Sequence, residues 1–233
     1  MAHPAMSQQT LITPKGNRLV YNGEIFKYEE LITKHEDFRN TTGCDTELLA
    51  WGLDKYGSNF IDELDSMHGF AYYDRQNKTI TLSRDHAGIK PLYYARIDKG
   101  LVFASEIKGM LDVVPDSRIL DNLACSMMTR AGTNPLRNTL FTNIKKVLPG
   151  ETIIYNIESR TVDHVKRTYI RPNANKDYVK DDLKVQFTNV VRRCAIGKRK
   201  IGVFLSGGID SSIVAYELNK IKDNVHTFTN RFT

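Results

Sequence analysis

A short run of small residues constrains the fold of this chain more than any other feature. The run is Ser206-Gly207-Gly208-Ile209-Asp210-Ser211-Ser212, and it follows the apolar stretch 201–205 and precedes an expected helix at 213–218. Where a strand passes through glycines into a helix N-terminus, backbone N–H groups and the helix dipole favour an anion. With a further strand at 225–228, the sequence predicts a βαβ unit of a parallel sheet that carries an oxyanion site.

The run differs from two common phosphate-binding motifs. No Gly-Lys-Ser/Thr closes it as in a Walker A loop, and its glycines are adjacent rather than spaced as G-x-G-x-x-G. It resembles the PP-loop, S-G-G-x-D-S, of ATP pyrophosphatases, which cleave ATP between the α- and β-phosphates. The resemblance implies a pyrophosphate site formed by N–H groups and hydroxyls of Ser206, Gly207, Gly208 and Ser211. It also implies that Asp210 organises Mg²⁺, a hard cation that prefers oxygen ligands.

A simpler interpretation of the same residues needs no ligand. A glycine-rich turn between a strand and a helix, with Asp210 or Ser211 as an ordinary helix N-cap, has the same composition. The number of fixed positions after an apolar strand favours the PP-loop over this turn.

Length and composition describe an ordinary globular protein with one large or two small domains. The chain has 233 residues, of which 41% are hydrophobic and 26% are charged, as is usual for folded domains. No stretch approaches the ~20 apolar residues of a membrane span, and the first residues lack the features of a secretory signal. We therefore expect no membrane partner.

The cysteines point to a reducing compartment. Cys44, Cys125 and Cys194 are an odd number at wide spacing, with no zinc-ligand pattern. A cytoplasmic location follows as the expectation. Each cysteine is interpreted as a small apolar packing residue rather than a nucleophile.

The net charge of +6 does not indicate nucleic-acid binding. Most basic residues are scattered, and the one dense patch has no interleaved aromatic residues. It consists of Arg192, Arg193, Lys198, Arg199 and Lys200. Because the patch directly precedes the loop at Ser206, a solvated face or a rim that attracts phosphate explains it better.

The first half of the chain mixes short strands and helices in an α+β pattern. Expected strands lie at 18–21, 69–73, 79–83, 92–95 and 101–104. The pair Asn22-Gly23 is expected to break the first strand, and 74–78 to form a hairpin turn. Expected helices are 28–35 and one that is capped by Asp45 or Thr46, carries Leu48, Leu49, Trp51 and Leu53, and ends at Gly57.

The second half begins with a connecting region. Residues 115–142 are expected to contain a helix at 120–130, and 152–155 with 161–165 to form a hairpin. The polar, proline-containing segment 171–176 is interpreted as a linker. A helix at 181–194 is expected to place Leu183, Phe187, Val190 and Val191 on one side.

Several short motifs occur in a fixed order before the loop. They are Asn22-Gly23-Glu24-Ile25, Gly43-Cys44-Asp45-Thr46-Glu47, Ser83 to Tyr93, Phe103 to Lys108 and Leu148-Pro149-Gly150. The ordered set resembles glutamine-hydrolysing asparagine synthetase along nearly the whole chain. It implies an incomplete α+β N-terminal-nucleophile-type amidotransferase part with a connecting region over 1–170. The start of an α/β PP-loop domain, adenine nucleotide α-hydrolase-like, follows over 177–233.

The resemblance implies the chemistry of a ligase. Glutamine is hydrolysed to ammonia, ATP activates aspartate as β-aspartyl-AMP, and ammonia attacks it to give asparagine. The Asn22 amide and the Gly23 N–H would form the oxyanion hole, where fixed donors commonly contribute several kcal/mol. Glu24 and Asp45 would complete the glutamine site by holding the α-amino group.

The nucleotide site has two further implied members. Leu205 and Asn230 would meet the adenine-ribose end of ATP, beside the PP-loop residues. Asparagine departs from the apolar residue usual in the family at position 230.

Each glutamine-site residue also has a structural interpretation. Asn-Gly is the commonest two-residue hairpin turn, and Asp45 alone would be a helix cap. Arg84-Asp85 is interpreted as a mainly structural ion pair.

No catalytic nucleophile is assigned. The family places cysteine directly after the initiator methionine, with its own α-amine as base, whereas removal of Met1 exposes Ala2 here. Cys44 and Ser7 are internal and have no free amine. The sequence is therefore expected to be truncated at both ends, with most of the synthetase domain after Thr233.

Three functions remain open. The first is an asparagine synthetase fragment that uses glutamine, aspartate and ATP, is inactive alone as a glutaminase, and is completed by a partner chain or a homo-oligomer. The second is another PP-loop ligase, such as a β-lactam-synthetase-like protein. The third is a non-catalytic glutamine- or nucleotide-binding partner of a complete synthetase, since half of a sandwich exposes strand edges and apolar surface.

Overall fold

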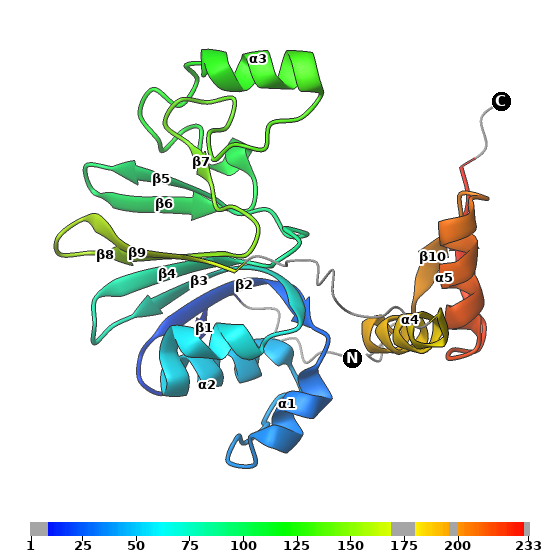
Figure 1. The fold of residues 1–233 in the computed structure, drawn as a ribbon. Coiled ribbons are helices and arrows are strands. Elements are labelled where there is room, and N and C mark those ends of the chain that lie inside the picture. The colour runs from blue at the N-terminus through cyan, green and yellow to red at the C-terminus, as the bar shows by residue number, and fades with distance from the viewer. Residues whose placement is uncertain (1–8, 169–179, 196–199, 231–233) are drawn as a thin grey trace. The chain divides into compact units, whose positions relative to one another are not determined.

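The computed structural model describes residues 9–168, 180–195 and 200–230. The chain divides into two compact units, Ala2–Ile170 and Arg171–Thr233. Figure 1 shows the strands of the first unit and the helices α4 and α5 of the second.

A six-stranded antiparallel sheet forms the centre of the first unit. Its order is β1 (Leu11–Ile12), β2 (Arg18–Ile25), β3 (Ser66–Asp74), β4 (Thr79–Arg84), β8 (Glu151–Asn156) and β9 (Thr161–Arg167). The hairpins expected for β3–β4 and β8–β9 are confirmed. Alternating side chains give this sheet two apolar faces, so it can be covered on both sides.

A second, three-stranded sheet covers one face of the first. It consists of β5 (Tyr93–Ile97), β6 (Gly100–Ala104) and β7 (Lys145–Lys146), with β5 in the middle. Leu82 and Ile153 of the large sheet pack with Leu92 and Val147 in one buried cluster, joined by Phe103 of β6. The two sheets therefore form a sandwich, as Figure 1 shows.

Helices cover the other face of the large sheet. They are α1 (Tyr28–Lys34), α2 (Asp45–Tyr56) and the 3₁₀ helix η2 (Gly57–Glu63). Leu48, Leu49 and Phe60 are fully buried against Leu19 and Phe70 of the sheet. Both helices expected here are confirmed, and α2 ends at Gly57 as expected, where φ is +62°.

The connecting region contains η3 (Ile107–Gly109) and α3 (Asn122–Ala131). The helix expected near 120–130 is confirmed. The Asp121 carboxylate caps α3 by accepting the Ala124 N–H at 2.8 Å.

The predicted break in the first strand is wrong. Strand β2 continues through Asn22 and Gly23, which pair with Gly69 and His68 of β3. A Cβ on Gly23 would overlap the Met67 carbonyl oxygen and lie 2.7 Å from the Tyr21 ring. Glycine is needed here because two backbones approach closely, and not because the chain turns.

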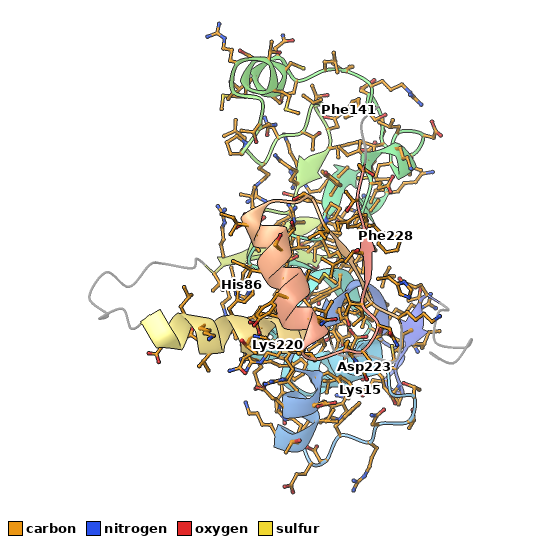
Figure 2. The ribbon with its side chains drawn as sticks, turned by 90° about the vertical axis from the view of Figure 1, so that its right-hand side faces the viewer. Lys15, His86, Phe141, Lys220, Asp223 and Phe228 are labelled. Atoms are coloured by element: carbon orange, nitrogen blue, oxygen red, sulfur yellow. The ribbon has the colours of Figure 1, made fainter. Side chains whose placement is uncertain are left out.

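The second unit is a βαβ arrangement preceded by a helix. It comprises α4 (Lys180–Cys194), β10 (Gly202–Phe204), α5 (Ile209–Asn219) and β11 (His226–Phe228). The strands β10 and β11 pair in parallel, which confirms the expected βαβ unit. Glu217 on α5 accepts from the Thr188 hydroxyl on α4 at 3.0 Å and pairs with Lys220 at 2.8 Å. Figure 2 shows Lys220 at the end of α5 and Phe228 on β11.

The expected apolar stripe of α4 is only partly right. Phe187, Val191 and Ala195 pack into the core of this unit with Val203 of β10, a row spaced four residues apart. Leu183 and Val190 are 54% and 51% exposed, and neither belongs to the buried cluster that contains Phe187 and Val191.

Three other expectations concern the same region. The predicted linker 171–176 lies outside the described residues, as do Lys198 and Arg199 of the basic patch. Cys194 is exposed, so its interpretation as a packing residue is wrong, whereas Cys44 and Cys125 are half-buried. No helix in the described parts of the chain is long and apolar enough to cross a bilayer.

Candidate functional site

One edge of strand β2 is the centre of the candidate glutamine site. The Phe26 N–H donates to the backbone carbonyl of Asp65 at 2.8 Å, on the β3 side. The Ile25 N–H donates to Asp45 Oδ2 at 3.1 Å, on the opposite edge. Because N–H directions alternate along an antiparallel strand, the Gly23 N–H points to the same edge as that of Ile25.

This edge is open beyond its first residues. Strand β1 pairs only with Arg18 and Leu19. Further along, the Gln9 side-chain amide donates to the Tyr21 carbonyl at 2.6 Å. The described strands therefore leave the Gly23 N–H unpaired, as an oxyanion donor requires.

Asp45 is not the helix cap that its position suggests. Residue Cys44 is the N-cap of α2 and makes no side-chain cap. The Asp45 carboxylate turns to the edge of β2, where Oδ2 also accepts the Tyr21 hydroxyl at 3.1 Å. Burial, and then Asp45, raises the pKa of Tyr21, so the phenol stays protonated and donates.

Glu47 is a member of this site that the sequence did not identify. Its carboxylate accepts the N–H groups of Thr41 and Thr42 at 3.2 and 3.0 Å, and also both hydroxyls. The side chain thus fixes the loop that leads into Asp45. A glutamate shortly after a Thr-Thr-Gly turn, reaching back at a helix start, resembles a capping box and is the available signal.

The Asn22 side chain lies on the cavity side of β2. Its amide is 3.5 Å from the Ser105 hydroxyl, and both residues line an open cavity of about 230 Å³ with Gln9, Leu92 and Phe103. Glu24, two residues along, is exposed. The structure thus places Asn22, Gly23 and Glu24 consecutively on β2 and brings Asp45 to its edge.

Arg84 and Asp85 support the loop after β4 rather than each other. Arg84 donates to the carbonyls of Gly88, Lys90 and Val147 at 2.7–2.9 Å. Asp85 is buried and accepts backbone N–H groups, including those of His68, Ile89 and Lys90. No ion pair joins the two in the described chain, so the structural interpretation fits and the predicted ion pair is wrong.

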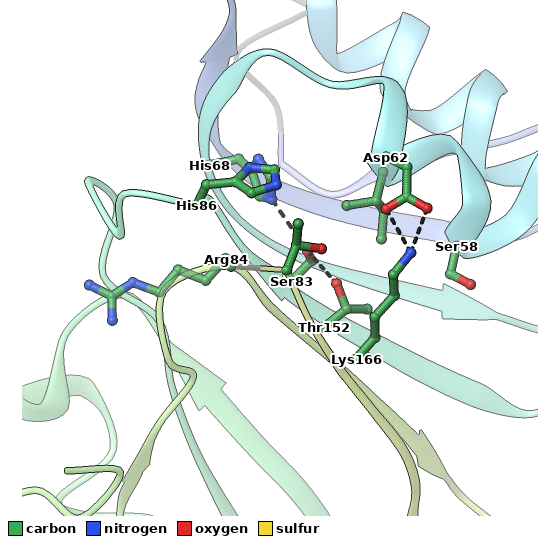
Figure 3. A pocket seen from close by; sticks show the side chains of 11 residues that line it. Ser58, Asp62, His68, Ser83, Arg84, His86, Thr152 and Lys166 are labelled. Carbon is green, nitrogen blue, oxygen red and sulfur yellow. Dashed lines mark hydrogen bonds and ion pairs between the residues drawn. The ribbon is translucent and has the colours of Figure 1, made fainter. Parts of the chain in front are cut away.

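A second, much smaller cavity lies beside β4 and β8. Figure 3 shows His68, Ser83 and Thr152 in one hydrogen-bonded row, and Lys166 paired with Asp62 at 2.7 Å. Its volume of about 20 Å³ suits roughly one water molecule. It is too small for a metabolite, and we do not consider it a substrate site.

The loop at Ser206 has the geometry of an anion cradle. Gly207 adopts φ +83°, and Gly208 is the N-cap of α5 with no side-chain cap. The Ser211 hydroxyl is 3.0 Å from that of Ser206 and accepts the Ser206 N–H at 3.2 Å. The interpretation of Asp210 or Ser211 as an ordinary N-cap is therefore wrong, and the first turn of α5 is left open for an anion.

The other candidate nucleotide residues lie at the same end of the parallel pair. The Leu205 N–H donates to the Phe228 carbonyl at 2.8 Å. The Leu205 carbonyl accepts the Thr229 hydroxyl at 2.8 Å. Asn230 lies two residues after the end of β11 and is exposed, as is Asp210. Since carboxyl ends of parallel strands are the usual ligand edge, this position suits a nucleotide.

The described residues contain no cluster of three or more potential metal ligands. Asp210, in the first turn of α5, is the carboxylate of the loop. Mg²⁺ is commonly held by one or two carboxylates together with substrate phosphates, so a single exposed aspartate beside a phosphate cradle fits that mode.

Comparison with protein families identifies the two parts. Residues 3–169 match the glutamine amidotransferase domain family, and residues 182–233 match the asparagine synthase family. The first match spans most of the chain, which therefore belongs to the glutamine amidotransferase domain family. This confirms the fold class predicted for both parts.

Curated relatives show which enzymes the chain resembles. Asparagine synthetase [glutamine-hydrolyzing] 2 of Bacillus subtilis is 31% identical over 95% of this chain and 32% of its own length. A putative asparagine synthetase of Methanocaldococcus jannaschii is 29% identical over 91% of this chain and 42% of its own length. The asparagine synthetase of Bos taurus is 30% identical over 87% of this chain and 36% of its own length. The resemblance to glutamine-hydrolysing asparagine synthetases is confirmed. The chain spans between about a third and two-fifths of these relatives.

Among solved structures, glutamine PRPP amidotransferase from B. subtilis, complexed with ADP and GMP, has a TM-score of 0.48 at 16% identity. The match covers 96% of this chain and 49% of that one.

Proposed function

We propose that the first unit binds glutamine along the open edge of β2, as part of an ATP-dependent synthesis of asparagine from aspartate. One observation carries this proposal: the Gly23 N–H and the Asp45 carboxylate, bonded to Ile25, share one edge. Gly23 and Ile25 are two residues apart, so their N–H groups are separated by about 7 Å along the strand. An extended glutamine spans a comparable distance between its side-chain carbonyl and its α-amino group.

Each group then has a definite task. The Gly23 N–H and the Asn22 amide would stabilise the oxyanion that develops on the glutamine carbonyl, where removal of one donor commonly costs about 3 kcal/mol. Asp45 and Glu24 would neutralise the α-ammonium group. Ser105, beside Asn22, would orient its amide.

The proposal includes no nucleophile in this chain. Cys44 is the N-cap of α2, Cys125 lies on α3 and Cys194 ends α4. None of these thiols lies beside a free α-amine, which would act as the base in N-terminal-nucleophile chemistry. The chain alone is therefore expected to bind glutamine without hydrolysing it.

Calorimetric titration with L-glutamine tests this site. Asp45→Asn is expected to weaken binding by about tenfold to a hundredfold, because a charge-assisted hydrogen bond to the ammonium is lost. Asp54→Asn is the matched control, since Asp54 also lies on α2 and accepts a buried tyrosine hydroxyl. Equal affinities for the wild type and Asp45→Asn would contradict the glutamine site. Release of glutamate and ammonia from glutamine would contradict the expected inactivity of the chain.

We propose that the second unit binds the pyrophosphate part of ATP at the loop 206–212. The open first turn of α5, the left-handed Gly207 and the paired hydroxyls of Ser206 and Ser211 support this. Mg²⁺, held by Asp210, would neutralise phosphate charge. The proposal divides the chain into an amidotransferase domain with connecting region, 1–170, and the first part of a PP-loop domain, 177–233. It also assigns the chain to the cytoplasm, where cysteine thiols stay reduced.

Binding of magnesium pyrophosphate tests the loop. Ser211→Ala is expected to weaken binding by about tenfold, because it removes a hydroxyl that both shapes the loop and faces the anion. Ser212→Ala is the control, because the Ser211 and Ser212 hydroxyls both donate to the Gly208 carbonyl, at 3.1 and 2.8 Å, whereas of these two only that of Ser211 also contacts Ser206. Similar losses in both variants would mean that helix stability, and not the cradle, controls affinity.

A further inference from the structure

The Asp45 carboxylate is held by one of its two oxygens. Oδ2 accepts both the Tyr21 hydroxyl and the Ile25 N–H, each at 3.1 Å. Oδ1 is 3.5 Å from the Cys44 thiol, which is a weak donor. Two strong donors on one oxygen fix the plane of the carboxylate and leave the other oxygen available to a ligand.

Tyr21 is itself firmly placed. The side chain is 5% exposed and belongs to the buried cluster between the sheet and α2. Its carbonyl accepts the Gln9 amide on the open edge. Since burial and Asp45 raise the pKa of Tyr21, the hydroxyl remains a donor throughout the neutral range.

The two donors act together because they come from one strand. Tyr21 and Ile25 lie four residues apart on β2, on either side of Gly23. Asp45 is thereby tied to both flanks of the proposed oxyanion donor. Without the hydroxyl, the Ile25 N–H alone would hold Oδ2, and the carboxylate could rotate about that bond.

We propose that Tyr21 is a positioning residue that aims Asp45 Oδ1 at the α-ammonium group of the ligand and so sets the preference for ligands that carry this group. This rests on the proposed glutamine site. Tyr21 does not touch the ligand in this arrangement, and it acts through Asp45.

The molecule provides a matched control. Tyr72, on the neighbouring strand β3, is also buried, and its hydroxyl donates to Asp54 of the same helix α2 at 2.6 Å. Tyr72→Phe removes an equivalent tyrosine–aspartate bond without touching Asp45. A general loss of stability would affect both phenylalanine variants, whereas a change in ligand preference is expected only for Tyr21→Phe.

The test compares the affinities of the whole chain for L-glutamine and for glutaramic acid, which lacks the α-amino group. Tyr21→Phe is expected to lower the ratio of the two affinities by about fivefold, the effect of one net hydrogen bond. Tyr72→Phe is expected to leave it unchanged. Hydrogen exchange of the Ile25 amide provides a second readout, and it is expected to accelerate only in Tyr21→Phe.

The outcomes separate this inference from the function on which it rests. If Asp45→Asn lowers the ratio and Tyr21→Phe does not, the role of Tyr21 is wrong and the glutamine site stands. If the wild type does not prefer glutamine to glutaramic acid, the glutamine site is wrong, and the role of Tyr21 with it.

Discussion

Replacing Arg137 with methionine is expected to lower the free energy of unfolding of the first unit by about 3 kcal/mol. Arg137 forms a two-pronged ion pair with Glu151, in which one bond is 2.8 Å long. Glu151 is 1% exposed. Without its partner, the carboxylate would keep only the Leu148 N–H, at 2.8 Å, as a donor. The cost arises from leaving a buried charge unpaired and not from the strength of the pair itself.

Urea unfolding followed by tryptophan fluorescence measures this effect. Trp51 is the only tryptophan of the chain and lies on α2, so its signal reports the first unit. Arg118→Met is the control, because Arg118 pairs with Asp112 at 2.9 Å in solvent and such pairs contribute less than about 1 kcal/mol.

A second substitution identifies the cause. Glu151→Gln in the Arg137→Met background removes the unpaired charge and is expected to recover part of the loss, while the amide oxygen still accepts the Leu148 N–H. The explanation fails if Arg137→Met costs no more than Arg118→Met, or if the double variant is no more stable than the single one.

The regular elements of this fold could be predicted because local patterns and tertiary packing agree. A continuous run of apolar and aromatic residues identifies β3, alternating apolar residues identify β4, and the glycine after α2 marks its end. The glycine run between β10 and α5 likewise indicates the βαβ unit. In each case the sequence signal lies within a few residues of the structure that it predicts.

The sequence indicated which residues form the candidate site, but not how these residues contact one another. Asn22-Gly23 carries the signal of a turn, yet pairing with β3 keeps it in a strand. Asp45 stands where a helix cap is expected, yet its partner Tyr21 is 24 residues earlier in the chain. Neither outcome follows from local propensity, because each depends on contacts between segments that are distant in sequence.

Acidification from pH 6.5 to pH 4 is expected to remove about 3 kcal/mol of stability from the first unit through His68 alone. The side chain is 1% exposed, and burial lowers the pKa of His68 to about 4. Asp85 opposes this shift and His86 adds to it. Between these pH values the unfolded chain binds a proton that the folded imidazole does not. The free energy of unfolding therefore falls by about 1.4 kcal/mol for each pH unit.

The neighbours of His68 favour the neutral ring. Its Nδ1 lies 2.8 Å from the Ser66 hydroxyl and its Nε2 lies 3.3 Å from that of Ser83. One hydroxyl can donate and the other accept, which suits either neutral tautomer. A protonated ring would need both hydroxyls to accept, and that of Ser83 is already shared with Thr152 at 2.9 Å. Among the residues that the structure describes, no carboxylate is hydrogen-bonded to the ring, so the added charge would remain poorly solvated.

Comparison with His68→Gln separates this contribution from that of the carboxylates. At pH 8 the histidine is neutral in both states, so the stability difference between the two proteins measures the substitution itself. As the pH falls to 4, that difference is expected to shift by about 3 kcal/mol in favour of glutamine, which does not titrate. The imidazole C–H resonances of His68, followed by NMR, are expected to titrate near pH 4. A difference that stays constant from pH 8 to pH 4 would show that His68 is protonated in the folded unit without penalty.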